Sequence, residues 1–174
     1  MSRIDYDLTK IRAIVFDVDG VLSPSTVPMS DTGIPVRMAN LKDGYAMQHA
    51  VKKGLILAII SGADVESIRG RFSIIGVKDI YLGIKQKLPV LEEWMAANGL
   101  YPEEIAYAGD DIPDLPCLQR AGLGVAPRDA APEVKSAAGF ITGAAGGYGV
   151  ARELIEEVMR AQGTWMSDMT AFGW

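Results

Sequence analysis

The stretch IRAIVFDVDGVLS, residues 11–23, decides which fold the chain is expected to adopt. It begins with a short, continuously apolar run at 13–16, which is typical of a strand buried on both faces of a sheet. Asp17 and Asp19 follow this run at once, and Gly20 comes next. Two carboxylates are costly to place together beside a hydrophobic core, because each opposes the ionisation of the other. The stretch therefore predicts a buried strand with a functional group at its end.

The same alternation of short apolar runs and amphipathic segments continues along the chain. Strands are expected at 13–16, 55–60, 105–108 and 123–126, with a short edge strand at 140–142. Helices are expected at 43–54, 63–76, 86–99 and 147–162. The first three helices each end in a glycine suited to a C-terminal cap. This order predicts an α/β fold, a Rossmann-like doubly wound parallel sheet with helices on both faces. A chain of 174 residues predicts one domain over 1–174.

Two segments interrupt the alternation. Residues 23–42 hold three prolines and a central SDTG turn signal, so they are predicted to form a β-hairpin flap directly after the paired aspartates. The last residues, 163–174, read GTWMSDMTAFGW and are apolar, aromatic and non-periodic. Such a tail is expected to dock, either on a neighbouring subunit or on the surface of its own subunit.

Composition narrows the function classes. The net charge is −5 and no basic block is present, which argues against a nucleic-acid partner. No apolar run approaches the roughly 20 residues of a membrane-spanning helix, and the first residues lack the apolar centre of a signal peptide, so a cytoplasmic protein is expected. Cys117 is the only cysteine and His49 the only histidine. An internal disulfide and a histidine-rich zinc site within one chain are therefore excluded, and any metal would be a hard cation such as Mg²⁺ held by oxygen.

Polar residues follow several of the predicted strands, at the edge where parallel sheets bind ligands. They are Asp17 and Asp19, Ser61 and Gly62, Lys87 at the start of a helix, and Asp110, Asp111 and Asp114. A carboxylate there can attack phosphorus as a nucleophile, and a second carboxyl can protonate a leaving alcohol and then activate water. Clustered acids suit Mg²⁺, while a serine hydroxyl, backbone N–H groups and a lysine can hold phosphoryl oxygens. Each feature alone is common, but the ordered set favours phosphoryl transfer.

This ordered set resembles the haloacid dehalogenase superfamily of aspartate-nucleophile phosphotransferases. FDVDGVL matches the first motif of that superfamily, IISG the second, the Lys87 region the third and GDDIPD the fourth. The resemblance implies that Asp17 is the nucleophile and Asp19 the general acid and base. It also implies that Ser61, Gly62 and Lys87 bind the phosphate.

The resemblance implies a metal site as well. Asp17, the backbone carbonyl of Asp19 and Asp110 would hold Mg²⁺. Asp111 and Asp114 would be auxiliary acids that position Lys87 and the water bound to the metal.

The spacing of the motifs leaves no room for the cap domain that most members of the superfamily carry. Asp17 and Ser61 are 44 positions apart and Ser61 and Lys87 are 26 apart, enough for the flap and one helix, then for one helix and one strand. The chain thus resembles the capless 3-deoxy-D-manno-octulosonate 8-phosphate (KDO 8-phosphate) phosphatases of lipopolysaccharide biosynthesis. That resemblance implies a homotetramer in which flap and tail lie at subunit interfaces and a neighbour closes the site.

The identity of the sugar acid stays open at this point. Ala63 and Tyr148 depart from residues common in the capless group, and a related nine-carbon nonulosonate 9-phosphate is the alternative substrate. Candidate substrate contacts are Lys42, Asp43 and Gly44 at the end of the flap, and Arg71 on the helix expected at 63–76. Arg71 could instead be a surface charge paired with an acid of its own helix, and His49 is expected to be packed or partly exposed.

Two functions of other classes compete with a phosphatase. A signalling receiver also phosphorylates an aspartate at a strand end, but Asp19 argues against it because receivers lack an acid and base at that position. A non-catalytic assembly subunit would not need the complete set of polar residues.

Overall fold

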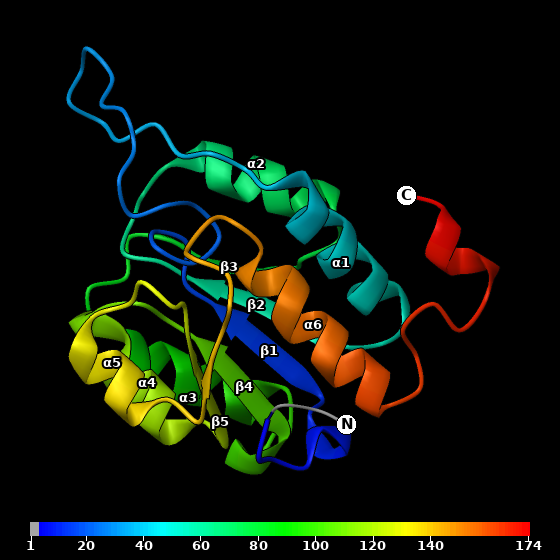
Figure 1. Ribbon diagram of the computed structural model, residues 1–174. Coiled ribbons are helices and arrows are strands. Elements are labelled where there is room, and N and C mark those ends of the chain that lie inside the picture. The colour runs from blue at the N-terminus through cyan, green and yellow to red at the C-terminus, as the bar shows by residue number, and fades with distance from the viewer. Residues whose placement is uncertain (1–3) are drawn as a thin grey trace.

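The computed structural model describes residues 4–174 and shows a six-stranded, entirely parallel sheet in the order β3-β2-β1-β4-β5-β6 (Figure 1). The strands are β1 (Ala13–Phe16), β2 (Ile56–Ile60), β3 (Asp79–Tyr81), β4 (Ile105–Ala108), β5 (Leu123–Ala126) and β6 (Phe140–Ile141). β1 lies between β2 and β4, so Phe16 pairs with Ile59 on one side and Ala108 on the other. The direction of winding reverses there, and in such sheets the ligand site lies at that switch point, beyond the strand ends.

Helices cover both faces of the sheet (Figure 1). They are α1 (Leu41–Lys52), α2 (Glu66–Ile74), α3 (Lys87–Ala97), α4 (Leu115–Arg120), α5 (Pro132–Ala137) and α6 (Val150–Ala161). Short 3-10 helices are η1 (Leu8–Lys10), η2 (Pro102–Glu104), η3 (Ile112–Asp114) and η4 (Met169–Phe172). Alternate β1 side chains enter opposite cores: Ile14 and Phe16 pack with α1, α2 and α6, whereas Ala13 and Val15 pack with α3, α4 and α5.

The predicted α/β fold is therefore confirmed. The glycines expected to end the first three helices have positive φ, with 92° at Gly54, 96° at Gly76 and 59° at Gly99, as a left-handed C-terminal cap requires. The sequence analysis did not predict α4 and α5, which are six residues each and too short to show a helical period. No helix in the described part of the chain is both long and apolar enough to cross a bilayer.

The flap, residues 23–42, forms a turn without a strand ladder and projects from the body of the molecule (Figure 1). Its tip is a tight turn at Gly33, with φ of 78°, and a single antiparallel bridge joins Met29 and Pro35. The predicted β-hairpin or flap is thus present as a reversal of the chain, held by hydrogen bonds from Ser30 N–H to the Ile34 carbonyl and from Val36 N–H to the Pro28 carbonyl, without longer paired strands. Three prolines in this segment have no N–H to donate, so a regular ladder cannot form.

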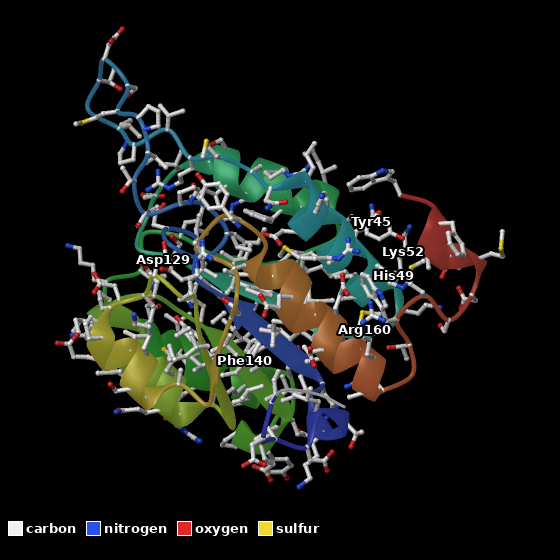
Figure 2. All side chains as sticks on the ribbon, in the orientation of Figure 1. Tyr45, His49, Lys52, Asp129, Phe140 and Arg160 are labelled. Carbon is white, nitrogen blue, oxygen red and sulfur yellow. The ribbon has the colours of Figure 1, made fainter. Side chains whose placement is uncertain are left out.

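The tail, residues 163–174, folds back along α1 of its own chain. Asp168 forms an ion pair with Lys53, and the Trp174 ring lies edge-on to Tyr45 with 5.6 Å between centroids. Figure 2 shows Tyr45, His49 and Lys52 on the side of α1 that the tail approaches. Trp165 covers the buried His49 at 5.5 Å between ring centroids. The tail is expected to dock either on a neighbouring subunit or on its own subunit, and in the single chain it docks on its own subunit.

Candidate active site

A cavity of about 520 Å³ opens at the carboxyl ends of the strands, around the switch point beside β1. Eight of the residues predicted for the site line this cavity. They are Asp17, Asp19, Ser61, Gly62, Lys87, Asp110, Asp111 and Asp114. Because these residues come from the ends of β1, β2 and β4 and from the start of α3, the parallel sheet itself brings them together.

At the floor of the cavity, Lys87 lies between two carboxylates. Its Nζ is 2.9 Å from Asp17 Oδ1 and 2.7 Å from Asp114 Oδ1, and all three side chains are buried. The backbone N–H of Asp17 donates to the carbonyl of Ala108 at 3.0 Å, which continues the β1–β4 ladder and fixes where Asp17 begins. Although burial opposes the charge of Lys87, the two carboxylates outweigh it and raise the lysine pKa. A permanent positive charge is thereby held beside the predicted nucleophile.

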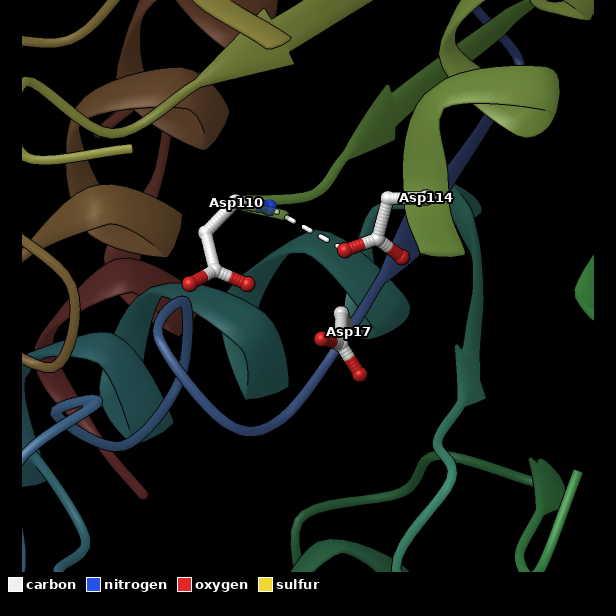
Figure 3. Close-up of side chains that lie close together, drawn as sticks. All are labelled: Asp17, Asp110 and Asp114. Atoms are coloured by element: carbon white, nitrogen blue, oxygen red, sulfur yellow. Dashed lines mark hydrogen bonds between the residues drawn. The ribbon is translucent and has the colours of Figure 1, made fainter. Parts of the chain in front are cut away.

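Asp114 anchors this arrangement from below. Its Oδ1 also accepts a hydrogen bond from Tyr107 Oη at 2.8 Å, and its Oδ2 accepts one from the backbone N–H of Asp110 at 3.1 Å (Figure 3). A Cβ at Gly109 would lie 2.3 Å from the Asp114 side chain, so only glycine allows this approach. Asp114 therefore orients Lys87 and the loop that carries Asp110.

Tyr107 is a site residue that the sequence analysis missed. It is fully buried in β4, beneath Asp114. A signal was available, because a tyrosine within an otherwise apolar strand needs a partner for its hydroxyl when buried.

Asp17, Asp110 and Asp114 each offer a carboxylate oxygen within 4.8 Å of the others (Figure 3). This is the oxygen donor set that a hard divalent cation takes. Asp114 already accepts from four donors, which are Lys87, Tyr107 and the backbone N–H groups of Asp110 and Asp111, so Asp17 and Asp110 have more capacity for a cation. Gly20 lets the β1 loop approach Asp110, since a Cβ there would lie 1.9 Å from Asp110 Oδ2. The Asp19 side chain does not join this cluster.

The electrostatics of the cluster also favour a cation. Burial, and then the neighbouring Asp114, raise the pKa of Asp17 well above its usual range. Burial, Asp114 and Asp111 raise the pKa of Asp110 to about 7. Carboxylates that resist ionisation together are stabilised in the charged form by a bound cation.

Asp19 faces a different partner. Both of its carboxylate oxygens accept hydrogen bonds from Arg37 of the flap, Oδ1 from Nε and Oδ2 from Nη2, each at 2.7 Å. Arg37 also lines the cavity, and the sequence analysis did not single it out. Its position in a non-periodic, proline-rich segment left no pattern by which to place it.

Ser61 and Gly62 lie at the end of β2 on the cavity wall. Ser61 is buried, and its Oγ accepts a hydrogen bond from the N–H of Ala63 at 3.2 Å. Asp111 is exposed at the rim, where its side chain accepts from the N–H of Ile112 and caps η3. Serine hydroxyl, backbone amides and Lys87 can together receive phosphoryl oxygens.

Four predicted substrate contacts lie outside the cavity of the single chain. Lys42 is exposed in the first turn of α1. Asp43 is buried, and its Oδ1 accepts from the N–H of Arg152 at 2.8 Å in the first turn of α6. A Cβ on Gly44 would lie 2.4 Å from Arg71 Nη2, so Gly44 makes room for Arg71. Arg71 lines a smaller neighbouring cavity of about 170 Å³. In the single chain the Asp43 carboxylate joins α1 to α6, and its role in substrate binding stays a prediction.

Known proteins of similar sequence first show the class of enzyme to which the chain belongs. A family model described as haloacid dehalogenase-like hydrolase matches residues 75–154. The parallel sheet, the strand-end aspartate and the acidic cluster together with this match define such a hydrolase.

Relatives of similar sequence narrow this class of hydrolase to one family of phosphatases. The 3-deoxy-D-manno-octulosonate 8-phosphate phosphatase KdsC of Escherichia coli K12 is 35% identical over 153 residues, which cover 88% of this chain and 81% of the relative. The crystal structure of the Yersinia pestis phosphatase of that name has a TM-score of 0.87 at 32% identity, covering 91% of this chain and 85% of the other. The Moraxella catarrhalis phosphatase, solved with magnesium, phosphate and KDO, has a TM-score of 0.89 at 29% identity and 96% coverage of both chains. The chain therefore belongs to the family of 3-deoxy-D-manno-octulosonate 8-phosphate phosphatases, and it is not a signalling receiver.

Proposed function

We propose that the protein is a Mg²⁺-dependent phosphatase that hydrolyses KDO 8-phosphate to KDO and inorganic phosphate. The observation that carries this proposal is the convergence of Asp17, Lys87 and Ser61 on one cavity beside Asp110. The Moraxella relative, which holds magnesium, phosphate and KDO, supports both the cation and the sugar acid.

The residues of the chain divide the reaction between them. Lys87 and Ser61 hold the phosphoryl oxygens, and an oxygen of Asp17 attacks phosphorus as the bond to the leaving oxygen breaks. Asp19 gives its proton to that leaving oxygen. Asp19 then takes a proton from water, which attacks phosphorus and releases Asp17 with inorganic phosphate. Mg²⁺, held by Asp17 and Asp110, would offset the negative charge that gathers at the phosphoryl group.

The alternative substrate is a nonulosonate 9-phosphate. Of the two departures from the capless group, Ala63 lines the cavity, whereas Tyr148 is exposed and does not line it. A small apolar side chain at Ala63 supplies no polar contact to the extra hydroxyl-bearing carbon, which favours the eight-carbon sugar acid.

We further propose a cytoplasmic homotetramer with flap and tail at subunit interfaces. On one chain, large apolar side chains of both segments are exposed: Met29 by 72%, Met169 by 81% and Phe172 by 67%. A second copy of the chain would remove this surface from water.

The direct test measures phosphate release from a panel of sugar phosphates and sugar-acid phosphates, with Mg²⁺ and with a chelator. KDO 8-phosphate should be the preferred substrate, chelation should stop turnover, and Asp17→Asn should lower kcat by at least about 1,000-fold, as loss of a nucleophile does. Full activity of Asp17→Asn would contradict the proposed mechanism. Preference for a different phosphate would contradict the proposed substrate.

A further inference from the structure

Arg37 ties the flap to the catalytic cavity. It is one of two cations in the flap, and the other, Lys42, does not line the cavity. Although Arg37 belongs to an exposed segment, its side chain is only 13% exposed. Its body also lines the smaller neighbouring cavity, beside Leu22 and Phe72. The Arg37 guanidinium is therefore held in one position by its contacts and is not a solvated surface charge.

The contacts of Arg37 occupy the acid and base of the proposed reaction. The two bonds of 2.7 Å to Asp19 form a bidentate fork, the strongest geometry between a guanidinium and a carboxylate. Nη1 donates to the carbonyl of Pro35 at 3.2 Å, which fixes the fork to the flap backbone. With this fork closed, both oxygens of Asp19 face Arg37, and neither is directed at a leaving oxygen.

For Asp19 to give its proton to the leaving oxygen, at least one bond of the fork has to open, because an oxygen that carries the proton no longer serves as a charged acceptor in a bidentate pair. A largely buried guanidinium that loses its carboxylate is costly to leave without an anion. In the proposed reaction Lys87 and Ser61 already bind the phosphoryl oxygens beside Asp17, so the anion for Arg37 would come from the leaving-group part of the substrate.

Among residues 4–174, the other cations that line the cavity are Lys87 and Lys85. Lys87 holds Asp17 and Asp114. Lys85 belongs to the loop in which the N–H of Ile84 donates to the carbonyl of Ser61 at 3.0 Å. Of the cations that line the cavity in the described part of the chain, Arg37 is the one that pairs with Asp19, where the leaving group would be.

We propose that Arg37 determines specificity by exchanging Asp19 for a carboxylate on the leaving-group part of the substrate. A planar carboxylate matches the guanidinium fork, and the exchange frees Asp19 to meet the leaving oxygen. This inference rests on the proposed function and names the group of the sugar acid that the flap reads.

The test compares two phosphates that differ only at the far end of the chain. 6-Phosphogluconate carries a carboxylate at the first carbon, and sorbitol 6-phosphate carries a hydroxymethyl group there. Binding of both, and of KDO 8-phosphate, is measured by calorimetry with Mg²⁺ in the Asp17→Asn protein, in which the ligands stay intact. Adding Arg37→Ala should weaken the two carboxylate ligands by about 10-fold or more, as loss of a charged hydrogen-bonded partner does, and sorbitol 6-phosphate by less than about 2-fold.

Two further variants make the result specific. Arg37→Lys keeps the charge without the fork, and should recover part of the affinity for the carboxylate ligands. Arg120→Ala removes an arginine paired with Glu92 on the surface and should change no affinity. Equal losses for both matched ligands, or no loss, would overturn the role of Arg37. Failure of the wild-type protein to hydrolyse KDO 8-phosphate would overturn the proposed function instead, because the matched pair still decides the role of Arg37.

Discussion

At the scale of single residues, the site depends on a buried hydrogen-bond network beneath the nucleophile. Lys87 approaches Asp17 because Asp114 holds it from the other side, and Asp114 is in turn held by the hydroxyl of Tyr107. Buried polar networks keep their geometry only when each member has its partners. Tyr107 thus acts on the chemistry through two intermediaries, without touching the substrate.

We expect Tyr107→Phe to lower kcat by about 10-fold with little change in KM, since removing one hydrogen bond to a charged group costs about 1.5–3 kcal/mol. The ring still fills its buried position, so the free energy of unfolding should fall by no more than that same amount, with no cavity term added. Steady-state kinetics on KDO 8-phosphate with saturating Mg²⁺ measures the effect. The matched control is Tyr101→Phe at an exposed tyrosine, and an equal kcat in Tyr107→Phe and wild type would contradict the network.

Residue by residue, the sequence predicts those parts of the site that the strand pattern positions. Asp17 and Ser61 each follow an apolar run directly and Asp110 follows one after Gly109, so parallel pairing alone brings them to one edge. Arg37 and Tyr107 could not be placed in this way. Arg37 lies in an irregular flap, so the sequence pattern does not show that it pairs with Asp19. The direction of the Tyr107 hydroxyl is set by tertiary packing, which a local sequence period does not reveal.

At the scale of elements, the packing of α1 against α6 gives a structural partner to Asp43, one of the predicted substrate contacts. Asp43 stands in the first turn of α1 next to the flap, which suggested the substrate site. Its carboxylate accepts from the N–H of Arg152, 109 positions further along the chain, where it satisfies one of the N–H groups left free at the start of a helix. The alternation that predicts both helices does not predict which of their ends meet.

This contact should make stability depend on pH. Burial raises the pKa of Asp43 to about 6, and the hydrogen bond from Arg152 offsets this only in part. Between the pKa of the unfolded chain, about 4, and about 6, the folded protein binds more protons than the unfolded chain, so the contribution of Asp43 to stability falls as the pH rises. We expect that loss to be at most about 3 kcal/mol.

Urea denaturation of wild type and Asp43→Asn at several values between pH 4.5 and pH 7 measures this contribution. Other acidic groups titrate in both proteins and cancel in the difference. Relative to Asp43→Asn, the wild type should become less stable as the pH rises. A constant difference would show that Asp43 ionises in the folded protein as it does in the unfolded chain, and a difference of the opposite sign would show that its pKa is lowered on folding.

At the scale of the whole molecule, residues 4–174 hold no cap domain, and the flap of the same chain lines the catalytic cavity through Ser25 and Arg37. Fold class, strand order around β1 and the missing cap all follow from the spacing of the apolar runs, because a parallel sheet admits few connections. The course of the tail does not follow, since a segment without a period carries no signal for the surface on which it docks. The structure shows that one side of the tail covers α1, with Ala171 buried and Asp168 paired with Lys53.

The other side of the tail presents large apolar side chains to solvent on the single chain. Met169 and Phe172 are largely exposed on the single chain, and we expect a second copy to cover them in solution. Met169→Ser with Phe172→Ser should therefore shift the tetramer toward smaller species, and the shift should grow on dilution because association follows mass action. Light scattering coupled to size-exclusion chromatography measures the mass at several protein concentrations. The matched control is Tyr101→Ser, which removes an exposed ring at a distance in sequence from flap and tail. An unchanged mass in the tail variant at all concentrations would show that the tail serves its own subunit alone, and the flap would then be the remaining candidate for the interface.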